Sequence, residues 1–320
     1  MAVAESTHPA GERLVLEPSL QQARALAEQS AGAYNLIPLR HTYIADCETP
    51  VSAFLKLRAL APDEPAFLLE SAEQGQRMGR YSFIGVRPRA VLRWALADGG
   101  DPYALAGEHV ARFRQVPTEE LPPFAGGAVG FFGYDLVRTV EPLGDPPPDP
   151  LGLPDMALML SDALVVFDHL KHTITILANA DIDGERDIER AYAAAAATID
   201  QVHGALAGGV PPTGPISSER QAPSFDSNMA PEAFEAMVKR IVQYIFAGDA
   251  FQVVPSQRFS AQVPVEAFSI YRGLRAVNPS PYMYFLDFGD FQVAGASPEP
   301  LLPVTGRRVT TKPIAGTRPR

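Results

Sequence analysis

The sequence predicts an α+β protein, because helix-like and strand-like segments occur in mixed order without regular alternation of strand and helix. Hydrophobic residues make up 46% of the 320 residues and charged residues 20%, as in an ordinary globular protein. The 31 prolines indicate many loops and strand ends. The chain is long enough to bury a sizeable core, in one large domain or in two.

The first part of the chain predicts one helical tail, one capped helix and several strands. Residues 1–35 read as a tail with an Ala/Gln/Glu-rich helical segment at 19–30. Thr49 followed by Pro50 predicts a helix start, with an N-cap hydroxyl and proline at the first helical position. Short runs rich in β-branched or aromatic residues and bounded by Gly or Pro predict strands at 66–70, 81–86, 91–97 and 126–134.

A hairpin, an alanine-rich helix and a linker follow. Residues 158–168 and 173–178 predict the two strands of the hairpin, and residues 187–206 predict the helix. Residues 208–227 are rich in Gly, Pro and Ser and have almost no apolar periodicity. This composition predicts a linker between two domains.

The last part of the chain begins with an amphipathic helix. Apolar residues recur at helical spacing through 229–246, and Gly248 occupies the C-cap position. We then expect a strand at 251–259, a helix at 265–277 and three or four antiparallel strands over 282–311.

The charge balance and cysteine content exclude several classes of protein. With 27 basic and 37 acidic residues the net charge is −10, which argues against nucleic acid or an anionic membrane as a partner. Cys47 is the single cysteine, so an internal disulfide is impossible and a reducing cytoplasm is the simplest location. No apolar run reaches membrane-spanning length.

Several motifs resemble those of the chorismate-utilising enzymes, and they are most similar to motifs of anthranilate synthase large subunits. They are NPSPYMYF (278–285), AGASPEP (294–300), TKPIAGTRPR (311–320), and LLES (68–71) followed by GRYSFIG (79–85). By motif order the resemblance runs from Leu36 to Arg320. It implies antiparallel β-sheets packed with outer helices.

The resemblance also implies an activity, a cofactor and partners. The intact enzyme would convert chorismate and ammonia to anthranilate and pyruvate, the first committed step of tryptophan biosynthesis. Ammonia would come from a separate glutamine amidotransferase subunit, Mg²⁺ would bind the substrate, and tryptophan would inhibit. In this family the magnesium carboxylates and the catalytic histidine lie in the part that would follow Arg320. We therefore expect no catalytic or metal-binding residue in this chain, and an inactive fragment.

The same resemblance implies a division into domains. We expect a tail at 1–35 and an N-terminal-type domain carrying the effector site at 36–207. After the linker at 208–227, residues 228–320 would form the first part of the chorismate-binding domain.

Gly316 and Thr317 match the family's contact with the chorismate carboxylate. Glycine lets the backbone approach closely, and backbone N–H groups beside a hydroxyl suit a carboxylate. Gln252 would line the side from which the nucleophile arrives. Related enzymes that add water have lysine there as a base, whereas a neutral amide suits ammonia, which needs no activation.

Ala315 separates two sister activities. Aminodeoxychorismate synthases, which serve folate synthesis, commonly have lysine at this position as a nucleophile, and a methyl group has no such chemistry. Gln252 and Ala315 together favour anthranilate synthase. An aminodeoxychorismate synthase component and a non-catalytic tryptophan-binding fragment remain the alternatives.

The tryptophan site implied by the resemblance combines two distant segments. Glu70 and Ser71 would contact the amino acid from the end of one strand. Pro281, Tyr282 and Met283 would complete the site. The alternative for Glu70 and Ser71 is a role in a turn or cap, which is common for such residues at a strand end.

Overall fold

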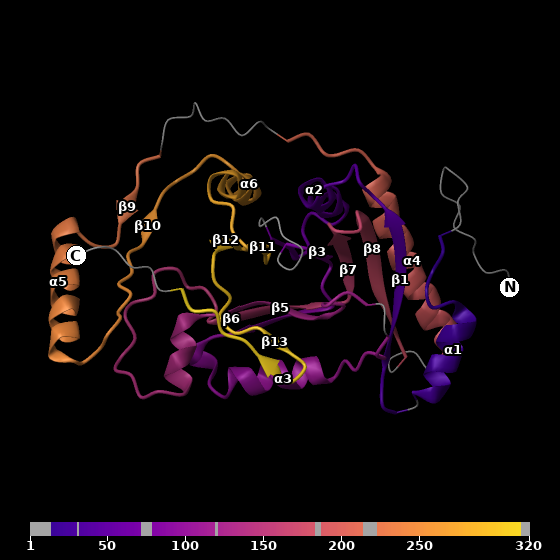
Figure 1. The fold of residues 1–320 in the computed structure, drawn as a ribbon, viewed down its shortest axis with the longest axis horizontal. Coiled ribbons are helices and arrows are strands. Elements are labelled where there is room, and N and C mark those ends of the chain that lie inside the picture. Colours follow the sequence, from indigo (N-terminus) through magenta and orange to yellow (C-terminus); the bar gives the residue numbers. More distant parts are fainter. Residues whose placement is uncertain are drawn as a thin grey trace. The chain divides into compact units, whose positions relative to one another are not determined.

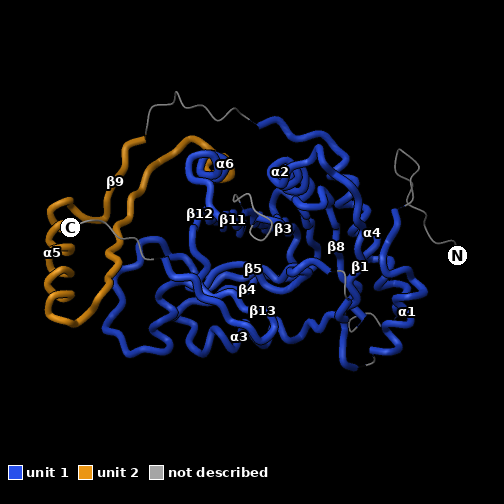
Figure 2. Tube along the Cα trace, in the orientation of Figure 1, with its two compact units in different colours: residues 1–213, 271–320 blue, residues 214–270 orange. Residues whose placement is uncertain are grey.

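The computed structural model describes residues 14–30, 32–71, 79–118, 121–182, 187–213 and 223–314. Contacts between residues divide the chain into two compact units (Figure 2). The first unit contains residues 1–213 and 271–320, and the second contains residues 214–270. The predicted domain boundaries follow a different division, and they stay a prediction.

The first unit is built on a seven-stranded antiparallel sheet with the order β1-β8-β7-β3-β2-β11-β12. Its strands are β1 (Leu36–Ile44), β2 (Ala66–Glu70), β3 (Tyr81–Val86), β7 (Ala163–Asp168), β8 (Thr173–Asp181), β11 (Tyr282–Asp287) and β12 (Gln292–Ser297). The last two strands come from the far end of the chain, and β11 pairs with β2. The sheet therefore joins segments that are far apart in sequence.

A three-stranded antiparallel sheet covers one face of the large sheet (Figure 1). It has the order β4-β6-β5 and contains β4 (Ala90–Trp94), β5 (Gly127–Phe132) and β6 (Met156–Ser161). Between the sheets, Phe67, Leu164 and Val166 from the large sheet share one core cluster with Ala157 and Met159 from β6. This cluster buries the alternate residues of both sheets, as a sheet-on-sheet packing requires.

Helices close both outer sides of this pair of sheets (Figure 1). The helix α3 (Pro102–Ala111) packs on the small sheet, where Ala106 shares a core cluster with Trp94 and Leu158. On the large sheet, α2 (Pro50–Leu60) contacts β2 and β3, and α4 (Ile188–Ala207) contacts β8 and β1. The helix α1 (Leu20–Gln29) contacts α4 and β1. The unit therefore has outer helices on two central sheets.

The helix α6 (Ala267–Val277) begins in the second unit and, from Tyr271 onward, belongs to the first. Tyr271 is fully buried, and its ring lies 5.7 Å from that of Phe285 in β11. On the same face of the sheet, Phe54 of α2 contacts Phe285 edge to face. Short elements complete the unit: the 3₁₀ helices η1 (Leu96–Asp98) and η2 (Tyr134–Thr139), and the paired strands β13 (Val304–Thr305) and β14 (Arg308–Val309).

The second unit contains α5 (Pro231–Ala247) and the short antiparallel pair β9 (Asp226–Ser227) and β10 (Phe259–Ser260). Gly248 ends α5 in the left-handed region with φ of 88°, which confirms its predicted role as a C-cap. No residue of α5 is buried.

Most predicted elements are confirmed, with ends shifted by a few residues. The Thr49 hydroxyl accepts a hydrogen bond from the Ser52 N–H at 3.1 Å and Pro50 is the first helical residue, as the sequence predicts. Two predictions are wrong. The strand expected at 158–168 is broken at Asp162, because β6 ends in the small sheet and β7 begins in the large one. The strand expected at 251–259 is irregular as far as Arg258, because only Phe259 and Ser260 pair with β9.

Candidate functional site at the paired ends of β2 and β11

The pairing of β2 with β11 brings together the two segments of the predicted tryptophan site. Met283 and Glu70 are directly opposed in the antiparallel register. Ser71 follows Glu70 at the end of β2, and Tyr282 precedes Met283 at the start of β11. The two motifs therefore meet at one end of the large sheet, although about two hundred residues separate them.

Glu70 is buried, with 4% of its side chain exposed. The hydroxyl of Tyr271 donates to Glu70 Oε2 at 2.6 Å, and Arg275 Nε lies 3.1 Å from the same oxygen. A buried carboxylate is tolerated only when it is paired and hydrogen-bonded, and α6 supplies both partners. Burial, and then the nearby charge of Glu70, raise the pKa of Tyr271 far above its usual value. The phenol therefore stays protonated and serves as a donor.

Two polar atoms at this end of the sheet lack a partner among the described residues. The hydroxyl oxygen of Ser71 is buried without any hydrogen bond. No described residue donates to the second carboxylate oxygen of Glu70 either, since both of its contacts go to Oε2. An unpaired buried hydroxyl costs about 1–3 kcal/mol, so a ligand that formed a hydrogen bond with it would remove that cost.

The remaining members of the predicted site supply apolar surface. Met283 is 2% exposed, and Pro281 and Tyr282 are half-buried. Beside them, Ser280 is buried. A carboxylate, a hydroxyl and apolar side chains are thus neighbours along β2 and β11, and a ligand with an ammonium group and a hydrophobic body requires this chemistry.

Sequence reasoning missed Tyr271 and Arg275. The two side chains lie one turn apart on α6, so they can reach the same neighbour. A tyrosine and an arginine at this spacing on a helix are common, and the contact with Glu70 exists only because α6 packs beside β2 and β11. The only signal in the sequence was the short connection from α6 into the 278–285 motif.

The residues predicted to line the chorismate site are described only in part. Gln252 is exposed and lies in the irregular segment of the second unit. Gly316 and Thr317, together with Ala315, lie outside the described residues. The described part of the chain contains no group of three or more His, Cys, Asp or Glu side chains placed to hold a metal ion. We therefore assign no magnesium ligand in it.

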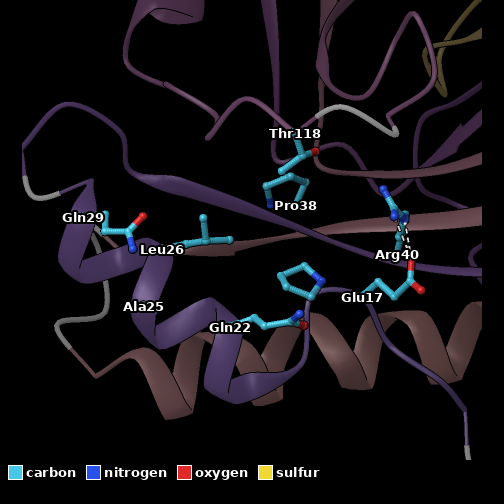
Figure 3. A pocket seen from close by; sticks show the side chains of 9 residues that line it. Glu17, Gln22, Ala25, Leu26, Gln29, Pro38, Arg40 and Thr118 are labelled. Carbon is cyan, nitrogen blue, oxygen red and sulfur yellow. Dashed lines mark hydrogen bonds and ion pairs between the residues drawn. The ribbon is translucent and has the colours of Figure 1, made fainter.

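A cavity of about 620 Å³ lies elsewhere in the first unit, between α1 and the edge strand β1 (Figure 3). Glu17 and Arg40 form an ion pair at 2.7 Å in its wall, and the side chains of Gln22, Leu26 and Pro38 also line it. Its lining includes none of the predicted site residues. No helix in the described ranges is both long and apolar enough to cross a bilayer.

Known proteins of one family resemble this chain in sequence and in structure. The family model described as chorismate binding enzyme matches residues 64–320. Anthranilate synthase component 1 of Pseudomonas aeruginosa is 44% identical over 311 residues, which cover 91% of this chain and 62% of that protein. The protein of the same name from Thermus thermophilus is 44% identical over 297 residues, covering 88% of this chain and 60% of that protein.

A solved structure agrees with these sequence relatives. The crystal structure of anthranilate synthase component I from Streptococcus pneumoniae matches with a TM-score of 0.60 and 36% identity, covering 75% of this chain and 56% of that one. The predicted resemblance and the predicted α+β class are thereby confirmed. The chain spans 60% and 62% of the length of the two curated relatives. Because the family model matches the chain continuously from Glu64 to Arg320, this protein belongs to the chorismate binding enzyme family.

Proposed function

We propose that this chain serves an anthranilate synthase, as part or all of the component that converts chorismate and ammonia to anthranilate and pyruvate. The observation that carries the proposal is the 44% identity with the Pseudomonas aeruginosa component 1 over 91% of this chain. Gln252 and Ala315 support the choice within the family. Neither side chain can act as the base or the nucleophile that other chorismate-utilising enzymes need.

In this proposal, Gly316 and Thr317 hold the ring carboxylate of chorismate. Glycine allows close approach of the backbone, and the threonine hydroxyl donates a hydrogen bond to the carboxylate. The Gln252 amide accompanies the incoming ammonia without removing a proton from it. Ammonia comes from glutamine through a partner amidotransferase component, and the protein works in the cytoplasm.

Magnesium is the cofactor that the family implies, as a Lewis acid for the substrate. The described residues do not form a set of ligands that fits it.

Tryptophan is the proposed ligand of the cluster at β2 and β11. The unpaired oxygen of Glu70 accepts from the ammonium group, and the Ser71 hydroxyl gains the partner that it lacks. Pro281 and Met283 contact the indole. Inhibition follows if tryptophan binds the inactive state of the enzyme more tightly than the active state.

A non-catalytic tryptophan-binding role is the second candidate, because both segments of the proposed tryptophan site are paired within the first unit of this chain. An aminodeoxychorismate synthase is less favoured because of Ala315.

The activity is tested with chorismate, Mg²⁺ and ammonia, with anthranilate followed by its fluorescence. We expect the component that contains this chain, as part or all of it, to form anthranilate at a rate above the uncatalysed background. Thr317→Val keeps the shape and removes the hydroxyl, so kcat/KM should fall about 10- to 100-fold, equivalent to about 1–3 kcal/mol. The matched change Thr305→Val, on the exposed strand β13, should leave kcat/KM unchanged. Wild-type kinetics in Thr317→Val would contradict the assignment of this residue to the substrate.

A further inference from the structure

The carboxylate of Glu70 is held from one side by a single helix. Both of its partners, Tyr271 and Arg275, belong to α6, and both contact Oε2. The ring of Tyr271 is fully buried and packs on Phe285, so the position of its hydroxyl is fixed. Among the described residues, neither Oε1 of Glu70 nor the Ser71 hydroxyl that follows it in the chain has a hydrogen-bond partner.

The two oxygens of this carboxylate therefore differ in their contacts with the described residues. Oε2 is bound to the protein and supports the negative charge in a buried position, because a hydrogen bond and an ion pair both stabilise the ionised form. Oε1 accepts no hydrogen bond from the described residues. A carboxylate held in this way presents a full negative charge at a fixed place, which favours a ligand with an ammonium group over a neutral one.

We propose that Tyr271 and Arg275 are positioning residues that make the site at β2 and β11 selective for ligands carrying an ammonium group. The inference rests on the proposed tryptophan site and deepens it: α6 sets the strength of the ammonium contact, while Pro281 and Met283 serve the apolar part of the ligand. Neither α6 residue has to touch the ligand. Their effect passes through Glu70.

Removing either contact should weaken the ammonium interaction in a predictable way. Tyr271→Phe removes one charge-assisted hydrogen bond and keeps the buried ring, so Glu70 is free to adopt other rotamers. Arg275→Met removes the compensating charge from a side chain that is 44% exposed, and this change is compatible with folding. An uncompensated buried carboxylate is costly, so the site loses its fixed negative charge.

The test measures dissociation constants for L-tryptophan and for indole, which has the same ring system but no ammonium group. Calorimetry on the full chain suits tryptophan, and NMR line broadening suits indole. In Tyr271→Phe and in Arg275→Met we expect tryptophan to bind about 10- to 100-fold more weakly, the range for a hydrogen bond to a charged group. Indole should bind within about twofold of wild type. Arg275→Lys, which keeps the charge, should recover part of the loss.

Two matched variants control for nonspecific effects. Tyr192 of α4 also donates a phenol hydrogen bond, to Pro18 O at 3.1 Å. Tyr192→Phe removes this bond and should leave the dissociation constants of both ligands unchanged. Arg272→Met removes an arginine from the same helix, one that forms no ion pair with the described residues, and should also have no effect.

The outcomes distinguish this inference from the function on which it rests. If wild type binds neither ligand, the proposed tryptophan site fails. If wild type binds tryptophan and both α6 variants bind it equally well, the positioning role is overturned and the site stands. Equal weakening of tryptophan and indole would show that α6 only supports the fold, which also overturns the inference.

Discussion

At the scale of single residues, the hydroxyl of Ser71 gives the sharpest test of feedback inhibition. Ser71→Phe would place a ring in the space assigned to the indole, and Ser71 has no role in the chemistry. We expect tryptophan inhibition of the native gene product to disappear while turnover of chorismate remains. Inhibition curves with and without the substitution decide it, and a curve that matches wild type would place the effector site elsewhere.

The smaller change Ser71→Ala serves as the control, because it removes the hydroxyl without adding bulk. Its two expected effects have opposite signs. Loss of an unpaired buried hydroxyl should leave the free chain as stable as wild type or slightly more stable. Loss of the ligand contact should weaken tryptophan binding by about 1 kcal/mol.

The motifs predicted the residues of the tryptophan site, which stays a prediction, and the structure shows why the two segments lie side by side. The register that opposes Glu70 to Met283 cannot be derived from either motif alone, since strand pairing depends on the whole sheet. Tyr271 and Arg275 could not be predicted, because their role depends on how α6 docks. The unpaired state of Ser71 is likewise a property of packing rather than of sequence.

At the scale of elements, the pairing of β5 with β6 depends on a glycine. A Cβ added at Gly130 would lie 1.9 Å from Ala157 O and 2.8 Å from Leu158 Cα, both backbone atoms of β6. Gly130→Ala should therefore lower the free energy of unfolding by about 1–3 kcal/mol or more.

Gly107→Ala is the matched control, because nothing lies within 4 Å of its added Cβ in α3. That change should stabilise the chain by about 0.5–1 kcal/mol. Urea denaturation measures both, and equal stability of the two variants would contradict the close approach.

The ion pair of Asp168 with Arg80, at the turn between β7 and β8, predicts how the stability of the chain depends on pH. Burial raises the pKa of Asp168, but Arg80, at 2.7 Å, and the N–H groups of Lys171 and Leu170 lower it more, so the net pKa lies below its usual value. A depressed pKa in the folded state adds stability above the unfolded value of about 3.9, and this stability is lost as pH falls through the folded value. Asp168→Asn should therefore destabilise the chain at pH 7.

The difference between Asp168→Asn and wild type should shrink as the pH falls below about 4, because the wild-type carboxylate then also becomes neutral. Urea unfolding at several pH values measures it. Asp63→Asn, on an exposed position without an ion pair among the described residues, should be as stable as wild type at pH 7. A destabilisation by Asp168→Asn that is constant with pH would rule out the carboxylate charge as its cause.

Elements with strong local signals were predicted well. Thr49 and Pro50 fix the start of α2, and Gly289 and Gly306 have positive φ in the turns that join β11 to β12 and β13 to β14. The break at Asp162 has no such signal, because a buried apolar run has the same hydrophobic pattern whether it stays in one sheet or passes between two. Residues 251–259 have strand-like composition, but a strand forms only where a neighbouring strand offers a partner.

At the scale of the whole molecule, the distribution of burial predicts unequal local stability. All 6 residues of β7 are buried in the centre of the large sheet, whereas none of the 17 residues of α5 is. An isolated helix of this length is only marginally stable in water, because most helical stability comes from packing of the apolar face. In α5 that face includes Val238, Val242 and Ile245, which are 37–43% exposed.

We therefore expect amide hydrogen-exchange rates to differ strongly between α5 and β7. Amides of α5 should exchange through local opening, orders of magnitude faster than those of β7, which open only when the large sheet unfolds. Exchange followed by mass spectrometry at several chain concentrations provides the measurement. Protection of α5 that equals that of β7 at all concentrations would contradict the marginal stability of this helix. Protection that grows with concentration would instead mean that a second copy of the chain covers the apolar face, since only association depends on concentration.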